Sequence, residues 1–471
     1  MTDKVIVEFE GEGSGVEELS WGQHEIWSVM RKTRSALPIV SVRALPPGQT
    51  VADVAAGLRF VMGRHQCLRT KLRFDLNGQV QQVVRARGEI TLEVVDAGDA
   101  DPGATAAAVA ARYEAREFDY EHEWPLRMAV ITHRGTATHV AETICHLALD
   151  AFGLAVLHDD FDRRNDRTGP VTAMQPLEQA RRQRGPGARR AHDASMRHFE
   201  RLAALVPDRM FSESADPRKP RFWQVTSESQ AGYQAAAVLA ARLGLSTSPV
   251  LLAAYAVALT PLTVLESGQP VVVHLVVSNR FRPGFSGSVS QVAQSAPCLI
   301  EQAGAPFAEV AVRTWKSALL AYKHAYYDPA GKDEVTKRIA AERGAEPDLS
   351  VFFNDRRVGS RELADAVSGN GDDAPGGLPP GRDELARTTL TWGEPYDVPE
   401  QKVFLSIVDM PGTLCCELRA DTHFVSPADM AGLLRRIESV LVDAALREGA
   451  SAEGASADSG TGAVAATGAV R

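Results

Sequence analysis

The chain has few cysteines and none at metal-binding or redox spacing. Its 471 residues include five cysteines, none of them in a C-x-x-C pair and two of them adjacent. Zinc ribbons and thioredoxin-type redox motifs depend on such pairs, so neither is expected and no metal is required. An odd number of cysteines, two of them adjacent, favours reduced thiols over a disulfide framework. The sequence therefore predicts a protein of the reducing cytoplasm.

The chain also lacks an excess of positive charge and a long apolar run. It carries 51 Lys and Arg against 60 Asp and Glu, a net charge of −9, which disfavours general binding to the phosphates of nucleic acids. The longest strongly apolar stretch, 250–259, has ten residues, whereas a membrane-spanning helix needs about 20. We therefore expect neither nucleic acid nor a membrane as partner.

What is present is an ordinary globular composition, 44% hydrophobic and 24% charged, in which helix and strand patterns are mixed. Helix N-caps are predicted at Ser20, Thr50, Ser248 and Ser426. Extended, apolar or alternating runs occupy residues 92–95, 128–132, 140–146, 271–277, 350–353 and 403–408. The mixture predicts an α/β fold with two layers.

One histidine stands out by its context. The spacing H-x-x-x-D occurs three times, at His146/Asp150, His158/Asp162 and His324/Asp328. Only His146 ends a strand-like run and precedes a helical pattern, and such strand ends commonly hold catalytic groups. It is a candidate general base, with a half-buried structural histidine as the alternative. The histidines of the other two matches are expected to be structural.

Three further motifs give a resemblance to a known family. Gln23-x-x-x-Trp27 is followed by R-H-Q-C-L-R-T at 64–70 and by C-H-L-A-L-D at 145–150. Together they resemble the first three core motifs of condensation domains from non-ribosomal peptide synthetases. A weaker similarity continues through S-N-R at 278–280 and into the C-terminal helix.

The resemblance implies a fold and a division of the chain. It implies two lobes related to chloramphenicol acetyltransferase, in a V arrangement with an interlobe tunnel. We place the N-terminal lobe at 15–165, an arginine-rich crossover at 166–195 and the C-terminal lobe at 196–447. Residues 448–471, rich in Ala, Gly and Ser, are expected to be a disordered tail.

The resemblance also assigns roles. His146 occupies the position of the histidine that deprotonates or orients an amine or hydroxyl attacking a thioester carbonyl. Asp150 would bond an arginine of the second lobe, for which Arg280 is the best match, and would hold the loop. The substrate would arrive on the phosphopantetheine arm of a carrier protein, with no bound cofactor.

Two residues depart from the family's H-H-x-x-x-D-G pattern. Cys145 stands at the first histidine, where it either packs as a small apolar side chain or acts as a nucleophile. Ala151 stands at the glycine, where a positive φ would strain it or its methyl group would narrow the passage. Gly153, two residues further along the chain, would relieve part of this strain or crowding.

Two groups of residues further along the chain can be interpreted either as functional or as purely structural. Phe353 and Trp392 either line the tunnel or belong to the core. The arginines of the crossover either dock an acidic carrier protein or are solvated linker charges. The docking candidates are Arg181, Arg182 and Arg184.

The sequence thus predicts a free-standing condensation-type acyltransferase of natural-product and antibiotic biosynthesis, a branch of secondary metabolism. It would join a carrier-bound acyl thioester to a small amine or alcohol. The main alternative is a degenerate module that binds a carrier protein and recruits a partner enzyme. A plant BAHD-type acyltransferase ranks last, because only T-W-G at 391–393 echoes the D-F-G-W-G motif of that family.

Overall fold

The computed structural model describes residues 2–76, 78–167, 169–266, 268–357, 382–398 and 400–458. They form two compact units. The first comprises Met1–Glu200, Val277–Ser295 and His324–Arg338. The second comprises Arg201–Val276, Ala296–Lys323 and Ile339–Arg471. Each unit is therefore built from segments that are far apart in the sequence.

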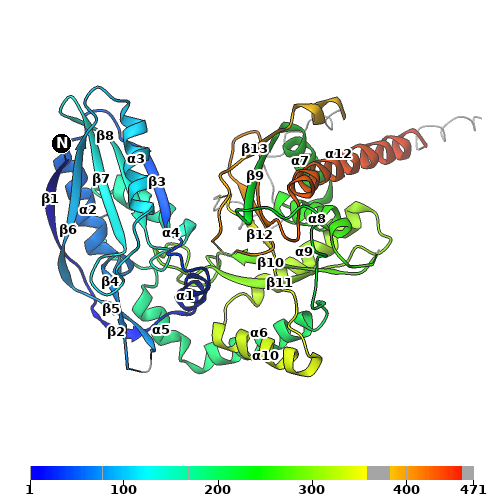
Figure 1. Cartoon of the computed structure of the whole chain (residues 1–471), viewed down its shortest axis with the longest axis horizontal. Helices are drawn as coiled ribbons and strands as arrows, with labels where there is room; N and C mark the ends of the chain where they lie inside the picture. Colours follow the sequence, from blue (N-terminus) through cyan, green and yellow to red (C-terminus); the bar gives the residue numbers. More distant parts are fainter. Residues whose placement is uncertain are drawn as a thin grey trace, which may run out of the picture. The chain divides into compact units, whose positions relative to one another are not determined.

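The first unit is organised around a five-stranded sheet (Figure 1). Its order is β1 (Thr2–Glu10), β6 (Arg87–Asp96), β7 (Leu126–His133), β8 (Thr136–Ile144) and β3 (Ile39–Ala44). β6 and β7 are parallel, and the other neighbours are antiparallel. A small second sheet joins β2 (Gly15–Glu18), β5 (Val80–Val84) and β4 (Thr70–Phe74).

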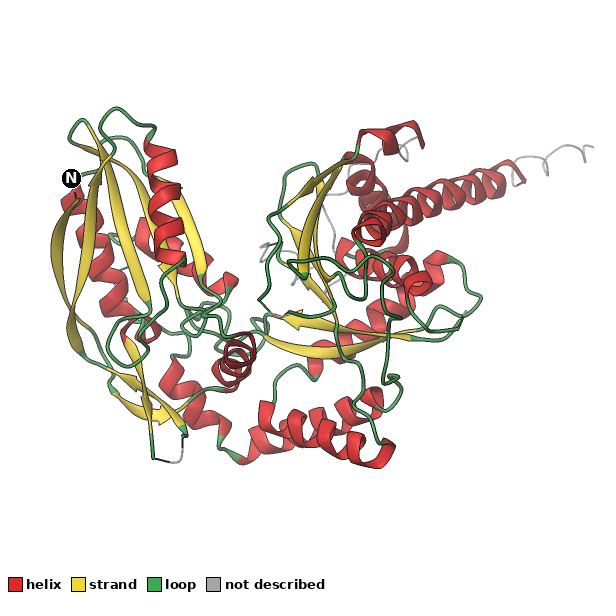
Figure 2. Ribbon diagram, in the orientation of Figure 1, coloured by secondary structure: helices red, strands yellow, loops and turns green. Residues whose placement is uncertain are grey.

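Helices cover both faces of the five-stranded sheet (Figure 2). α2 (Val51–Arg64) and α4 (Ala151–Asp162) pack through Leu58 and Leu157 into one core with Met128 and Val130. α3 (Pro102–Glu114) packs into a separate core with Ala129 and Ile131. Successive residues of β7 thus face opposite layers, as the period of two in a strand requires.

Local signals set the helix starts of the first unit. Ser20 caps α1 (Trp21–Thr33) and Thr50 caps α2, each through a complete capping box, as predicted. The first unit also contains η1 (Gln66–Arg69), α5 (Pro176–Gln183), and most of α6 (Pro186–Ala203) and α10 (Pro329–Arg343). The arginine-rich crossover is therefore largely helical.

The second unit contains most of a seven-stranded sheet. Its order is β11 (Gln294–Ile300), β10 (Val271–Val277), β12 (Val351–Asp355), β14 (Val403–Val408), β15 (Leu414–Asp421), β9 (Phe222–Ser229) and β13 (Thr389–Trp392). α7 (Gln230–Leu243), α8 (Thr247–Leu259) and α12 (Pro427–Asp458) pack together, and α9 (Phe307–Lys323) packs on α8. Two short 3-10 helices, η2 (Thr260–Leu262) and η3 (Arg382–Arg387), complete the described elements.

The mixed α/β class is confirmed, but two boundaries differ from the prediction. The backbone of α12 continues to Asp458, so the part of the expected tail from 448 to 458 is helical, and 459–471 lie outside the described residues. The segments Val277–Ser295 and His324–Arg338, both placed in the C-terminal lobe from the sequence, belong to the first unit.

No single helix in the described part of the chain is long and apolar enough to cross a membrane. Taken together, α7 and α8 are long and apolar enough to span a membrane, but the chain bends by 114° between them.

Candidate active site

The H-x-x-x-D segment forms the turn between β8 and α4. β8 ends at Ile144, and Asp150 is the N-cap residue of α4, so His146 lies on a loop fixed at both ends. His146 is half-buried. Its Nδ1 atom is buried and has no hydrogen-bond partner among the described residues.

The surroundings of His146 keep its imidazole neutral. Burial lowers the pKa of His146 below its ordinary value of 6.5. The carbonyl groups of His146 and Leu149, the carboxylate of Asp150 and the side chain of Gln291 oppose this shift without reversing it. A neutral imidazole near pH 7 has one lone pair available, which is what a general base requires.

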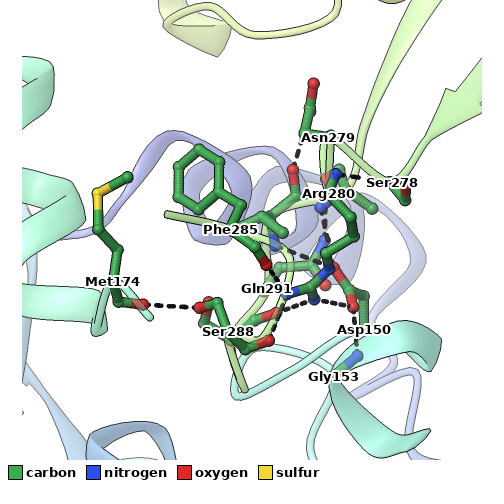
Figure 3. Close-up of polar contacts among 12 residues, drawn as sticks. Asp150, Gly153, Met174, Ser278, Asn279, Arg280, Phe285, Ser288 and Gln291 are labelled. Atoms are coloured by element: carbon green, nitrogen blue, oxygen red, sulfur yellow. Dashed lines mark hydrogen bonds and ion pairs between the residues drawn. The ribbon is translucent and has the colours of Figure 1, made fainter. Parts of the chain in front are cut away.

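Asp150 is a structural anchor. Its side chain is 5% exposed and forms an ion pair with Arg280. Its Oδ1 atom accepts a hydrogen bond from the backbone N–H of Gly153 at 2.8 Å, and Oδ2 accepts from the N–H groups of Val292 and Ala293 at 3.1 Å each. Figure 3 shows Arg280 and Gly153 approaching this carboxylate. All four donors are protein groups, so Asp150 positions the loop.

Arg280 ties a second loop to the same point. Besides Asp150, its guanidinium donates to the carbonyl oxygens of Phe285 at 3.1 Å, of Ser290 at 3.0 Å and of Ser288. The partner expected from the resemblance is therefore the one observed. Its place is different, because Arg280 lies in a segment of the first unit and not in the second.

Further buried polar residues complete this loop, and of these only Asn279 belongs to a motif recognised from the sequence. Gln179 of α5 donates to Ser288 Oγ at 3.1 Å and to Ser290 Oγ at 2.8 Å. Figure 3 shows the bond that Ser288 Oγ donates to the Met174 carbonyl. Asn279, at φ 57°, donates to the carbonyl groups of Val292 and Ala325. These residues are scattered along the chain, and no local pattern connects them.

The R-H-x-x-L-R-T motif supports α4 and the strand ends around it. Arg64 Nε and His65 Nε2 lie 2.9 and 3.0 Å from Oδ2 of Asp160 on α4. Arg69 is fully buried and donates to the carbonyl groups of Gly13, Arg85 and Glu12. The motif thus holds the helix that follows the H-x-x-x-D loop.

The structure shows the surroundings of both residues that depart from the family pattern. Cys145 is 1% exposed in an apolar cluster with Met30 and Phe118, and burial raises the pKa of its thiol to about 12. It therefore packs, and its environment opposes a thiolate nucleophile. Ala151 is exposed at the first position of α4 and is not among the residues with positive φ. Gly153 provides clearance, since a Cβ there would lie 3.3 Å from the Ser290 backbone.

The remaining aromatic and histidine candidates differ in their burial and contacts. Phe353 is 4% exposed and stacks on Tyr255 in the core of the second unit, which agrees with the core interpretation of this residue. Trp392 is 41% exposed on an edge strand, edge-on to Trp223. His158 bonds Glu142 and His324 stacks on His198, so both are structural as predicted.

The three crossover arginines are exposed, and each already forms an ion pair within the chain. Arg181 and Arg184 each lie 2.7 Å from a carboxylate oxygen of Glu17. Arg182 pairs with Glu178 one helical turn away at 2.6 Å. Arg181 and Arg184 therefore have a structural task, whereas the pair of Arg182 is a surface contact of small energetic weight.

The part of the chain that the structure describes holds no group of three or more His, Cys, Asp and Glu side chains arranged to bind a metal ion.

Comparison with known proteins identifies the fold. Residues 41–164 match the family model of the condensation domain. No curated protein sequence matches the chain.

Three solved structures are similar over nearly the whole chain. The structure described as the molecular basis for condensation domain-mediated chain release from the enacyloxin polyketide synthase has a TM-score of 0.67 at 19% identity, covering 98% of this chain and 86% of that one. The SgcC5 protein from Streptomyces globisporus, in complex with a naphthyl ethanediol and sucrose, has a TM-score of 0.66 at 19% identity, with 91% and 99% covered. The first condensation domain of the calcium-dependent antibiotic synthetase has a TM-score of 0.65 at 14% identity, with 92% and 97% covered.

The chain therefore has the fold of condensation domains, and the predicted resemblance to that family is confirmed. Condensation domains are generally acyl-transferring enzymes. Within this fold, the anchored H-x-x-x-D loop is the candidate active site.

Proposed function

We propose that the protein transfers an acyl group from a carrier-bound thioester to an amine or hydroxyl, with His146 as the general base. One observation carries the proposal: His146 is half-buried on a loop whose anchor, Asp150, is saturated by four protein donors, and burial lowers the pKa of its imidazole. A rigid loop that presents a neutral imidazole fits proton abstraction in an acyl transfer.

The step balances without a cofactor. The imidazole takes the proton of the attacking N–H or O–H group while the nucleophile adds to the thioester carbonyl. The tetrahedral intermediate then expels the pantetheine thiolate, which takes the proton back from the His146 imidazolium. The products are an amide or ester and a free carrier thiol.

The descriptions of two similar structures suggest a hydroxyl acceptor as the first to test. One concerns chain release from a polyketide synthase, and the other holds an ethanediol ligand. We therefore propose ester formation from a carrier-borne acyl chain as the first reaction to test, with amines as the second set of acceptors.

The donor would arrive on a small acidic carrier protein, and exposed arginines of α5 and α6 are the proposed docking surface. Arg182, Arg190 and Arg197 are exposed, and neither Arg190 nor Arg197 has an ion pair among the described residues. Reversing these three residues to Glu should weaken carrier binding, and more strongly at low salt. Arg181 and Arg184 are unsuitable for this test, since their loss would leave Glu17 unpaired. An unchanged affinity would exclude the docking surface.

The alternative function is the recruiting module, which departures from the family's H-H-x-x-x-D-G pattern would favour. The packing of Cys145 in an apolar cluster and the unstrained backbone of Ala151 weigh against it. Reconstitution with carrier-bound acyl groups and candidate alcohols or amines distinguishes the two functions. Turnover that depends on His146 is the result expected for the enzyme. Carrier binding without turnover for any donor would favour recruitment.

A further inference from the structure

Several buried polar atoms near the candidate catalytic loop have no hydrogen-bond partner among the residues that the structure describes. They include Nδ1 of His146 and Oε1 of Gln291. Gln291 is 3% exposed, and its Nε2 atom donates to the Ala293 carbonyl at 3.1 Å. An unpaired buried amide oxygen costs about 1–3 kcal/mol, so a donor for it is expected nearby.

The backbone on both sides of Gln291 is fixed relative to His146. The carbonyl of Ser290 accepts from Arg280 at 3.0 Å, and the N–H of Val292 donates to Asp150 at 3.1 Å. On a third side lies α1, where a Cβ on Gly22 would come within 2.4 Å of the Gln291 carbonyl oxygen. The residue that anchors the His146 loop thus also anchors the loop that carries Gln291 (Figure 3).

We propose that Gln291 is a positioning residue, whose Oε1 atom accepts a hydrogen bond from the Nδ1–H group of His146. A neutral imidazole carries one N–H, and an acceptor at Nδ1 selects the tautomer whose lone pair is on Nε2. Nε2 then faces the nucleophile. This last step rests on the proposed acyl transfer, whereas the hydrogen bond itself does not.

The electrostatic surroundings agree with this arrangement. Gln291 is one of the groups that raise the pKa of His146, beside the carbonyl groups of His146 and Leu149 and the carboxylate of Asp150. The two backbone carbonyls are therefore the competing acceptors for the same proton. The test has to separate them from Gln291.

Nitrogen NMR of histidine-labelled protein makes this separation, with His146→Ala assigning the signal. The wild type should show the Nδ1–H tautomer. Gln291→Met, which keeps the volume and removes the acceptor, should give a mixture of tautomers and a lower pKa of His146. Gln291→Glu should raise that pKa. The matched control is Gln294→Met on the same segment, whose amide bonds Glu25 and the Tyr327 carbonyl, and which should leave the His146 signal unchanged.

An unchanged tautomer and pKa in Gln291→Met would overturn the proposal and assign the proton to the backbone carbonyls. If that variant fails to fold, the upward pKa shift in Gln291→Glu decides the question, and its absence rejects the contact. In turnover, Gln291→Met should lower kcat by about 10- to 100-fold with little change in KM. Should the NMR signals move as expected while His146→Ala remains fully active, the hydrogen bond stands and the proposed acyl transfer fails.

Discussion

The ion pair between Asp150 and Arg280 gives the sharpest stability prediction. Arg280→Met removes the only charged partner that the described residues offer Asp150 and leaves the carboxylate, 5% exposed, with three backbone N–H donors but no countercharge. Removing one member of a buried pair costs about 3–5 kcal/mol. The loss of donors to the carbonyl groups of Phe285, Ser288 and Ser290 adds to this. Since a domain is stable by roughly 5–15 kcal/mol, the variant should be close to unfolding.

Hydrogen exchange of the α4 amides measures this effect locally. Arg280→Met should lower their opening free energy by about 3–5 kcal/mol. Asp150→Asn on that background should recover part of the loss, because asparagine still caps α4 and carries no charge. The matched control is Arg163→Met at the end of the same helix, whose exposed pair with Asp159 at 3.5 Å should contribute under about 1 kcal/mol. A loss below about 1 kcal/mol in Arg280→Met, or no recovery with Asp150→Asn, would refute the reasoning.

Three further outcomes are expected. Cys145→Ser should destabilise the fold by about 1–3 kcal/mol in thermal unfolding, because it buries a hydroxyl among apolar side chains, yet leave turnover per folded molecule unchanged. A large loss of turnover would instead support a thiol role. Arg69→Lys should cost about 2–4 kcal/mol in urea unfolding, since one ammonium group cannot reach the three carbonyls of Gly13, Arg85 and Glu12. A change below about 1 kcal/mol would contradict that account. Burial raises the pKa of Glu17, but the hydrogen bonds and charges of Arg181 and Arg184 outweigh it and lower the pKa below 4.5. The stability difference between wild type and Glu17→Gln should therefore be full above pH 4.5 and vanish as the pH falls through the lowered pKa. A difference independent of pH would contradict it.

The sequence was sufficient to place the H-x-x-x-D loop at 146–150 between a strand and a helix, and to distinguish this setting from those of the other two matches. The strand before His146 and the helix after it are present, and the same context argument placed His158 and His324 correctly as structural residues. These predictions succeeded because they depended on local periodicity and capping, which act over a few residues.

Contacts between residues far apart in the chain could not be predicted from a single sequence. Asp150 and Arg280 are 130 positions apart, and the resemblance paired them but put Arg280 in the wrong unit, since nothing local marks a return of the chain. Gln291 lies in a stretch of serines, glutamines and small apolar residues with no helix or strand period that would mark its position. The strain considered for Ala151 required a positive φ, which the residue type alone does not reveal. Ala151 is the first residue of α4 and does not have a positive φ, so this strain is absent.

The central claim is that neutral His146 is the base in acyl transfer. The most direct test is the single-turnover rate of transfer from an acyl-loaded carrier to an alcohol acceptor, with His146→Ala compared with wild type and His158→Ala. The account predicts that His146→Ala lowers the rate by about 10²- to 10⁴-fold, whereas His158→Ala retains it. Because burial lowers the pKa of His146, the wild-type rate should hold through neutral pH and fall only below 6.5. Equal rates in wild type and His146→Ala, with the same acid limb, would contradict the account.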